Sequence, residues 1–178
     1  MPQPDLHAER IFLRMLRESD FPEVAYLRSD PKVNRYVHRP PAKTTEDALA
    51  FIEKIRAGVN QGSNYYWVIA AKEEDRMIGS ICLWNFSEEG KHAEIGYDLH
   101  PDHQHRGFMS EAMKCVLEFA FHTLHLAHVE AFTHRDNERS IHLLKKHGFR
   151  WIPDRVDADN VNNVIFFLDI EGFKTTYL

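Results

Sequence analysis

Apolar and polar residues alternate with the two-residue period of β-strands in seven segments of the chain. They are residues 10–17, 65–72, 77–86, 91–99, 127–133, 149–153 and 163–170. Apolar residues recur at helical spacing in four other segments, which begin near Ser19-Asp20, Thr44-Thr45, Gly107 and Glu138. The prolines at 40–41 exclude a helix between the first two of these segments.

The order of these elements predicts the fold class. Three consecutive strands between residues 65 and 99 are typical of an antiparallel meander, and the rest of the chain alternates strands with helices. We therefore expect an α+β (mixed α/β) domain with about seven strands and about four helices. No repeat or low-complexity linker interrupts the 178 residues, so the prediction is a single domain over residues 1–178.

The strongest functional signal is the turn at Gly107, between the strand that ends near Leu99 and a helix that extends to about His122. A helix that starts after such a turn offers free backbone N–H groups and a positive dipole end, which together favour a phosphate. The chain contains neither G-x-x-x-x-G-K-[ST] nor G-x-G-x-x-G, so a P-loop and a dinucleotide fold are not expected. Taken alone, one glycine also fits a relaxed helix start.

A second motif, Asn137-x-x-Ser140, follows further along the chain, before Lys146-x-Gly148-Phe149. With Gly96-Tyr97, Gln104-x-x-Gly107 and Glu111-Ala112, the sequence resembles the GNAT superfamily of acyl-CoA-dependent N-acyltransferases. It is most similar to the branch that acetylates the N-terminal amines of ribosomal proteins. The resemblance covers nearly the whole chain, because residues 9–14 and 67–69 also fit. It implies a GNAT fold with a mostly antiparallel, twisted sheet and splayed central strands.

The resemblance implies acetyl-CoA as cosubstrate, with its diphosphate on the turn formed by Gln104, His105, Arg106, Gly107, Phe108 and Met109. The pantetheine arm is expected between strands 94–99 and 127–133, with backbone atoms of Asp98 and Leu99 and the amide of Asn137 as partners. Met109 departs from the family pattern, which has a small residue there. Because backbone N–H groups hold the diphosphate, binding is still expected if the Met109 side chain points away.

The family reaction is a direct attack of a neutral amine on the thioester, which needs a proton acceptor and a donor to the leaving thiolate. The motif position implies Ser140 as the donor, although its residue type also fits a helix cap. Glu94 is the first choice for the acceptor, the alternative being a solvated edge charge, and His134 is the second choice. Lys145 or Lys146 is a candidate for the 3′-phosphate, or a solvated charge at the helix end.

The composition narrows the other possibilities. A net charge of −5 without a Lys/Arg run argues against nucleic acid as a partner. No long apolar stretch or leader pattern is present, so we expect a cytoplasmic protein without a membrane partner. Cys82 and Cys115 lack metal or redox spacing and are expected to be buried thiols. The histidines of residues 100–105 do not favour a metal site, because Pro101 and the missing fourth ligand oppose one.

The functional hypothesis is acetyl transfer from acetyl-CoA to a primary amine, with the N-terminal α-amine of a ribosomal protein as one acceptor. An α-amine has a pKa of about 7.7–8.0, so it needs a weaker base than a lysine does. The alternatives are a small-molecule N-acetyltransferase, acting on an antibiotic, polyamine or amino acid, and a CoA-binding regulatory protein without turnover. The acceptor groove is expected to be formed by the first two helices and residues 155–163, in a monomer or homodimer.

Overall fold

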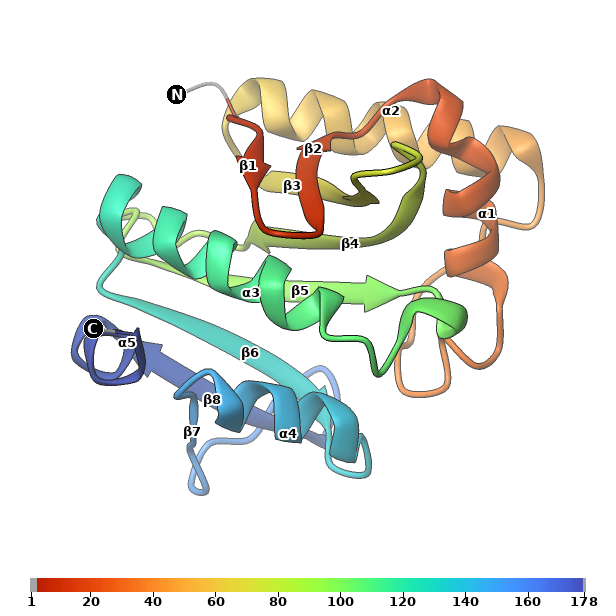
Figure 1. Ribbon diagram of the computed structural model, residues 1–178. Helices are drawn as coiled ribbons and strands as arrows, with labels where there is room; N and C mark the ends of the chain where they lie inside the picture. The colour runs from red at the N-terminus through yellow and green to blue at the C-terminus, as the bar shows by residue number, and fades with distance from the viewer. Residues whose placement is uncertain (1–2, 178) are drawn as a thin grey trace.

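The computed structural model describes residues 3–177, which form one eight-stranded sheet and five α-helices (Figure 1). The sheet order is β1-β2-β3-β4-β5-β6-β8-β7. The strands are β1 (Leu6–His7), β2 (Ile11–Met15), β3 (Tyr65–Ala71), β4 (Met77–Trp84), β5 (His92–Leu99), β6 (His128–His134), β7 (Arg150–Trp151) and β8 (Asn163–Asp169). The helices are α1 (Phe21–Ser29), α2 (Thr45–Gln61), α3 (Phe108–Glu118), α4 (Glu138–Lys146) and α5 (Ile170–Tyr177). The mixed α+β class and the mostly antiparallel sheet are confirmed.

The structure has one strand and one helix more than the expected seven strands and four helices. Strand β1 pairs with β2 through two residues only, which is too short for an alternating pattern to be visible in the sequence. Helix α5 follows β8 directly, and Asp169 accepts the N–H of Gly172 at its start. The expected strand at 163–170 therefore ends at Asp169, and the chain continues as a helix.

Two hydrophobic layers cover the two faces of the sheet. On one face, which we call the α3 face, Met113, Leu144 and Phe173 of α3, α4 and α5 are buried against the central strands. On the other face, the α1 face, Leu27 of α1 and Ile52 of α2 pack on the strands β2 to β4. The odd-numbered residues of β5 belong to the core of the α3 face, so its even-numbered residues lie on the α1 face.

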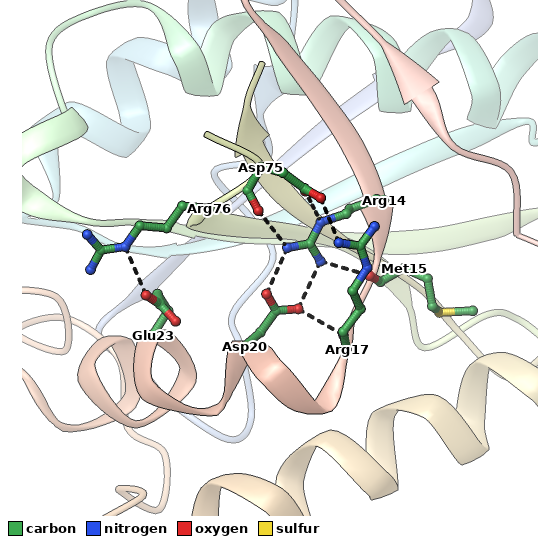
Figure 2. Close-up of polar contacts among 7 residues, drawn as sticks. All are labelled: Arg14, Met15, Arg17, Asp20, Glu23, Asp75 and Arg76. Carbon is green, nitrogen blue, oxygen red and sulfur yellow. Dashed lines mark hydrogen bonds and ion pairs between the residues drawn. The ribbon is translucent and has the colours of Figure 1, made fainter. Parts of the chain in front are cut away.

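Helix α1 begins at Phe21, directly after the expected start near Ser19-Asp20. Asp20 makes no side-chain cap to α1. Its carboxylate instead binds the Arg14 guanidinium through two hydrogen bonds of 2.8 Å, and both residues are buried (Figure 2). Asp75, in the β3–β4 turn, binds Arg14 at 2.6 Å and Arg17 at 2.7 Å. Partial burial raises the pKa of Asp75, but the two guanidinium groups outweigh it and leave that pKa lowered. The network joins β2, the start of α1 and this turn.

The second helix begins as expected. Thr44 is its N-cap, and a capping box links Thr44 to Asp47. The helix ends at Gln61, and Gly62 closes it in the left-handed conformation.

Strands β5 and β6 are parallel neighbours that pair over only three residues each, 92–94 with 128–130. Beyond this short pairing β5 stays bound to β4 and β6 stays bound to β8, while the two strands separate from each other (Figure 1). The splayed central strands that we expected are therefore confirmed. We call the region between residues 95–99 and 131–134 the strand opening.

Candidate active site

The inner edges of the strand opening are not paired with each other. Residues 95–99 pair with β4, and residues 131–134 pair with β8. The edges that face one another can therefore bind an extended ligand in the way that they would bind an added strand. The sequence prediction places the pantetheine arm in this region.

Only every second residue of β5 directs its backbone groups into the strand opening. The N–H of His100 donates to the C=O of Ile78 at 2.8 Å, so the backbone groups of His100 face β4. Asp98 lies two residues earlier, and its backbone groups therefore face β4 as well. Tyr97 and Leu99 direct theirs toward the opening. The expectation for Leu99 agrees with this geometry, whereas Asp98 uses its backbone within the sheet and does not offer it to a ligand.

The Asp98 side chain binds the connection between α1 and α2. Its carboxylate accepts a hydrogen bond from Ser80 Oγ at 2.7 Å and pairs with Arg39 at 2.9 Å. Arg39 in turn donates to the C=O of Leu27 at 2.9 Å and to Asn34 Oδ1 at 2.7 Å. Asp98 thus holds the loop after α1 over the α1 face.

The turn before α3 has the backbone geometry of an anion site. His105 and Gly107 have positive φ angles of 61° and 82°. Gly107 is the N-cap of α3 and provides no side-chain cap, so the first N–H groups of the helix lack an intrahelical acceptor. A Cβ atom at Gly107 would lie 2.9 Å from Arg10 Nη2. Both the φ angle and this contact therefore favour glycine.

Two arginine side chains lie beside the same turn, and the two residues that follow Gly107 are buried in the core. The guanidinium carbons of Arg10 and Arg106 lie 4.7 Å and 4.9 Å from the centre of the Phe108 ring. Arg10 also pairs with Glu111 in the first turn of α3. Met109 is 9% exposed and belongs to the core, so its side chain points away from the turn. The larger residue at this position leaves the backbone donors accessible.

Gln104 bridges the two sides of the strand opening at its wide end. Its Nε2 donates to the C=O of Leu99 at 3.0 Å. Its Oε1 accepts a hydrogen bond of 2.7 Å from Arg139, in the first turn of α4. A phosphate group bound to the turn would therefore lie close to both Gln104 and the Arg139 guanidinium.

Asn137 and Ser140 have separate roles at the start of α4. Asn137 is the N-cap, and its side-chain oxygen accepts the Ser140 N–H at 3.2 Å. Ser140 Oγ instead lies 2.7 Å from the hydroxyl oxygen of Tyr97 on β5. Burial raises the pKa of Tyr97 to about 12, although the Ser140 hydrogen bond opposes the rise. Tyr97 is therefore protonated at neutral pH and orients the Ser140 hydroxyl across the opening.

Two carboxylates lie on the α1 face, where the strands begin to separate. Glu94 and Glu130 are register partners, and Glu130 is buried and paired with Arg155. Glu94 Oε1 accepts a hydrogen bond of 2.5 Å from Asn85 Nδ2. Burial raises the pKa of Glu94, and the carboxylates of Glu130 and Asp157 add to the rise, while Asn85 and Arg155 oppose it. Glu94 thus has an increased affinity for a proton.

Gly96 lies on the α1 face with Glu94, and other side chains pack closely against it. A Cβ atom at this position would lie 3.3 Å from Cys82 Sγ and 3.7 Å from Trp84 Nε1. Trp84 is the register partner of Glu94 and is 49% exposed, although it is a tryptophan within a strand. The exposed Trp84 indole, the Glu94 carboxylate and Gly96 therefore lie together on the α1 face.

His134 is less suited to accept a proton. Its Nδ1 accepts the N–H of Asp136 at 3.2 Å, and its ring lies 5.3 Å from the ring of Tyr36. With Nδ1 engaged, the neutral imidazole carries its proton on Nε2 and has no free lone pair for an amine proton. The geometry favours Glu94 over His134.

The remaining candidates lie apart from the strand opening or are engaged elsewhere. Lys145 and Lys146 are in the last turn of α4, at the opposite end from Asn137. His100 accepts the N–H of Asp102 and stacks on Tyr26. Within residues 3–177, no group of three or more His, Cys, Asp or Glu side chains can hold a metal ion. No helix in this range is both long and apolar enough to cross a membrane.

The sequence analysis assigned no role to five residues of this site, which are Arg10, Asn85, Tyr97, Glu130 and Arg139. Arg10, Tyr97 and Arg139 lie inside segments that carry the family resemblance, and their position in those motifs is the sequence signal for them. Asn85 and Glu130 belong to no motif, and only the register of β4, β5 and β6 brings them to Glu94.

Comparison with known proteins places the chain in a family. The model of the acetyltransferase (GNAT) domain matches residues 10–150. The N-acetyltransferase YoaA of Bacillus subtilis (strain 168) is 30% identical over 147 residues, which cover 83% of each chain. Two relatives from Escherichia coli (strain K12) are each 24% identical. They are the spermidine N(1)-acetyltransferase (80% of this chain, 74% of the relative) and the [ribosomal protein uS5]-alanine N-acetyltransferase (84% and 79%).

A solved structure has the same fold. The crystal structure of the ribosomal-protein-S5-alanine acetyltransferase from Vibrio fischeri matches with a TM-score of 0.81 at 18% identity, over 94% of this chain and 97% of the other. At this identity the match shows the fold alone. The family match spans both the turn before α3 and the start of α4. The chain therefore belongs to the GNAT family, and it is an acyl-CoA-dependent N-acetyltransferase.

Proposed function

We propose that this enzyme transfers the acetyl group of acetyl-CoA to the N-terminal α-amine of a protein or peptide by direct attack. The observation that carries the proposal is Glu94, a partly buried carboxylate with a raised pKa at the narrow end of the strand opening. The relative named as the alanine N-acetyltransferase of ribosomal protein uS5 supports a protein acceptor.

In this proposal the cosubstrate follows the strand opening from its wide end to its narrow end. The diphosphate binds the backbone N–H groups at the start of α3, with Gln104, Arg106 and Arg139 around it. The pantetheine arm pairs with the inner edge of β5 at Tyr97 and Leu99. The thioester then lies toward Glu94, where the two strands meet.

The reaction needs one proton acceptor and one proton donor. The α-ammonium group of the acceptor loses a proton to Glu94, and the amine lone pair attacks the thioester carbon. The carbon–sulfur bond breaks, and the thiolate takes the proton of the Ser140 hydroxyl, which Tyr97 orients. The new amide nitrogen then gives its one excess proton to the Ser140 oxygen, which restores the hydroxyl group. Glu94 releases its proton to solvent, so that the products are the acetylated amine and free CoA.

The proton affinities favour an α-amine over a lysine. A free α-amine has a pKa of about 7.7–8.0, whereas that of a lysine is about 10.4. A carboxylate with a raised pKa can deprotonate the first at moderate cost, but the second is a much poorer match. The exposed indole of Trp84, which is the register partner of Glu94, provides an apolar surface for the first side chain of a peptide.

A small polycationic amine is the second candidate. The carboxylates of Glu130 and Asp157 both add to the raised pKa of Glu94, and Arg155 is the cation near these groups. Such a site also suits a polyamine, and the relative named as a spermidine N(1)-acetyltransferase favours this class. An antibiotic or amino-acid acceptor belongs to the same small-molecule alternative.

A direct acceptor comparison tests the proposal. The enzyme and acetyl-CoA are incubated with a peptide that has a free N-terminus and no lysine, and the product is identified by mass spectrometry. A matched peptide with a blocked N-terminus and one internal lysine, spermidine and an aminoglycoside are run in parallel. We expect acetylation of the free N-terminus at the highest kcat/KM. Rapid acetylation of spermidine or the aminoglycoside with no reaction of the peptide would replace the peptide proposal.

A further inference from the structure

The backbone at Asn85 reverses the direction of two side chains. Asn85 follows the last residue of β4 and has a φ angle of 49°. In a continuous strand Asn85 would point to the α3 face and Phe86 to the α1 face. Phe86 instead packs against the core of the α3 face, 5.9 Å from the Tyr65 ring, and Asn85 reaches Glu94 on the α1 face. The left-handed conformation therefore brings the amide to the carboxylate.

The residue type at this position meets two requirements at once. Asparagine is one of the few residues other than glycine that adopt the left-handed region readily, and its amide is a hydrogen-bond donor. The loop that follows is closed, because Ser87 Oγ accepts the N–H groups of Lys91 at 3.0 Å and His92 at 3.3 Å. Glycine would satisfy the backbone but would provide no donor.

We propose that Asn85 is a positioning residue for the acetyl transfer, whose amide fixes the Glu94 carboxylate on the α1 face and keeps it ionised. The proposal rests on the role of Glu94 as proton acceptor. Because Asn85 binds Oε1, it leaves Oε2 of Glu94 for the proton of the acceptor amine.

The charges around Glu94 explain why such a donor matters. Glu130 on β6 and Asp157 in the loop before β8 both favour the neutral form of Glu94, as burial does. Arg155 favours the ionised form, but its guanidinium group is paired with Glu130. Asn85 is therefore the group that donates directly to the Glu94 carboxylate.

Two variants and a loop control test the proposal. Asn85→Gly keeps the positive φ angle and removes the donor, whereas Asn85→Asp keeps the shape and replaces the amide with a carboxylate. Gly90→Ala strains the same loop at φ 63°, without an atom within 4 Å of the added Cβ. The Glu94 carboxyl group is titrated in the free enzyme by carbon NMR, with Glu94→Gln to assign its signal.

We expect the midpoint of the Glu94 titration to rise by about half to one pH unit in Asn85→Gly, because one hydrogen bond to the carboxylate is lost. The rise is larger in Asn85→Asp, where two carboxylates face each other, and is absent in Gly90→Ala. The acid limb of kcat/KM should move by the same amount, with the rate at high pH unchanged.

Three results would overturn the proposal in different ways. An unchanged Glu94 midpoint in both Asn85 variants would show that the amide does not keep the carboxylate ionised. A uniform loss of rate at all pH values, matched by Gly90→Ala, would show a role in loop stability only. A shifted midpoint with an unshifted acid limb would show that Glu94 is not the proton acceptor, and the proposed mechanism would fail while the effect of Asn85 on Glu94 remained.

Discussion

The hydroxyl oxygen of Tyr97 lies 2.7 Å from Ser140 Oγ, and this contact joins β5 to the start of α4 across the strand opening. The two residues come from different elements, and Asn137 frees the serine hydroxyl by capping the helix in its place. Tyr97 is thereby a direct partner of the group that we propose as the proton donor.

Loss of the proposed donor should affect the chemical step. We expect Ser140→Ala to lower kcat by about 100-fold and to leave the Kd of acetyl-CoA nearly unchanged, because a thiolate forms only in the transition state. Tyr97→Phe should lower kcat less, by about three- to tenfold, since it removes one neutral hydrogen bond. Single-turnover rates and calorimetric Kd values measure the two effects. Unchanged turnover in folded Ser140→Ala would assign the serine a structural role.

The anion turn can be tested against a glycine with the same backbone strain. Saturation with acetyl-CoA at 100 times its Kd should stabilise the wild-type enzyme by about 2.7 kcal/mol. Gly107→Ala strains a residue at φ 82° and brings its Cβ to Arg10, so this gain should largely vanish. Gly62→Ala strains φ 74° at the end of α2, where nothing lies within 4 Å, and should lower Tm but keep the gain. Met109→Ala should affect binding less than Gly107→Val. Equal acetyl-CoA affinity in Gly107→Ala and wild type would exclude the turn as the phosphate site.

Replacement of the proposed proton acceptor should have a pH signature. Glu94→Gln should lower kcat/KM most at low pH, because the bound α-amine there keeps its proton unless a base removes it. The defect should shrink as the pH rises toward about 8, the pKa of a free α-amine. A pH series of initial rates with the peptide acceptor gives the comparison. The same loss at every pH would contradict the assignment of Glu94.

The buried ion pair between Arg14 and Asp20 (Figure 2) should contribute to the stability of the fold. Arg14→Ala leaves the buried Asp20 carboxylate without its partner and should cost about 3–5 kcal/mol of unfolding free energy. Arg17→Ala removes a pair whose side chains are 52% and 46% exposed, and should cost less than about 1 kcal/mol. Urea unfolding measures both values. A similar, small cost for the two variants would show that the buried pair adds nothing.

His147 should make the enzyme less stable in mild acid. It is buried between Ser110 and Tyr177, and burial, with a smaller effect of Lys146, lowers its pKa to about 4. Between pH 6.5, the approximate pKa of His147 in the unfolded chain, and about pH 4, the imidazole is protonated in the unfolded chain but stays neutral in the folded protein. The free energy of unfolding therefore falls as the pH falls through this range. The loss approaches roughly 3 kcal/mol near pH 4.

The measurement is urea unfolding at pH 7.0 and at pH 4.5, for the wild type and for His147→Gln. The glutamine keeps polar contacts but does not titrate in this range, so its stability should decline less between the two pH values. Parallel declines would show that His147 does not contribute.

Local patterns predicted the strands and helices well where they are long. The meander from β3 to β5 was predicted because alternation persists over seven or eight residues. The start of α2 was predicted only as near Thr44-Thr45, and the structure identifies Thr44 as the cap. Helix α5 was missed because it follows β8 without an intervening loop, and Ile170 continues the apolar alternation of the strand. The splay itself came from the family resemblance, since no residue pattern encodes where two parallel strands stop pairing.

The site was predicted only in part, because sequence patterns do not show which residues of neighbouring strands lie side by side. Alternation tells which side chains share a face, but it does not tell which neighbouring strand receives the backbone groups of Asp98. Asn85 and Glu130 lie in different strands or loops from Glu94, and their proximity depends on the register across three strands. Interactions of this kind become visible only when the strands are placed side by side.

The three-residue pairing of β5 with β6 also has a mechanical meaning. The sheet consists of two blocks, β1 to β5 and β6 with β8 and β7, and only a short seam of backbone pairing joins them. An extended molecule that occupies the strand opening completes this seam, so the acyl donor would serve as a structural member of the sheet during each catalytic cycle. Release of CoA would remove that member again, which links the rigidity of the enzyme to the stage of its reaction.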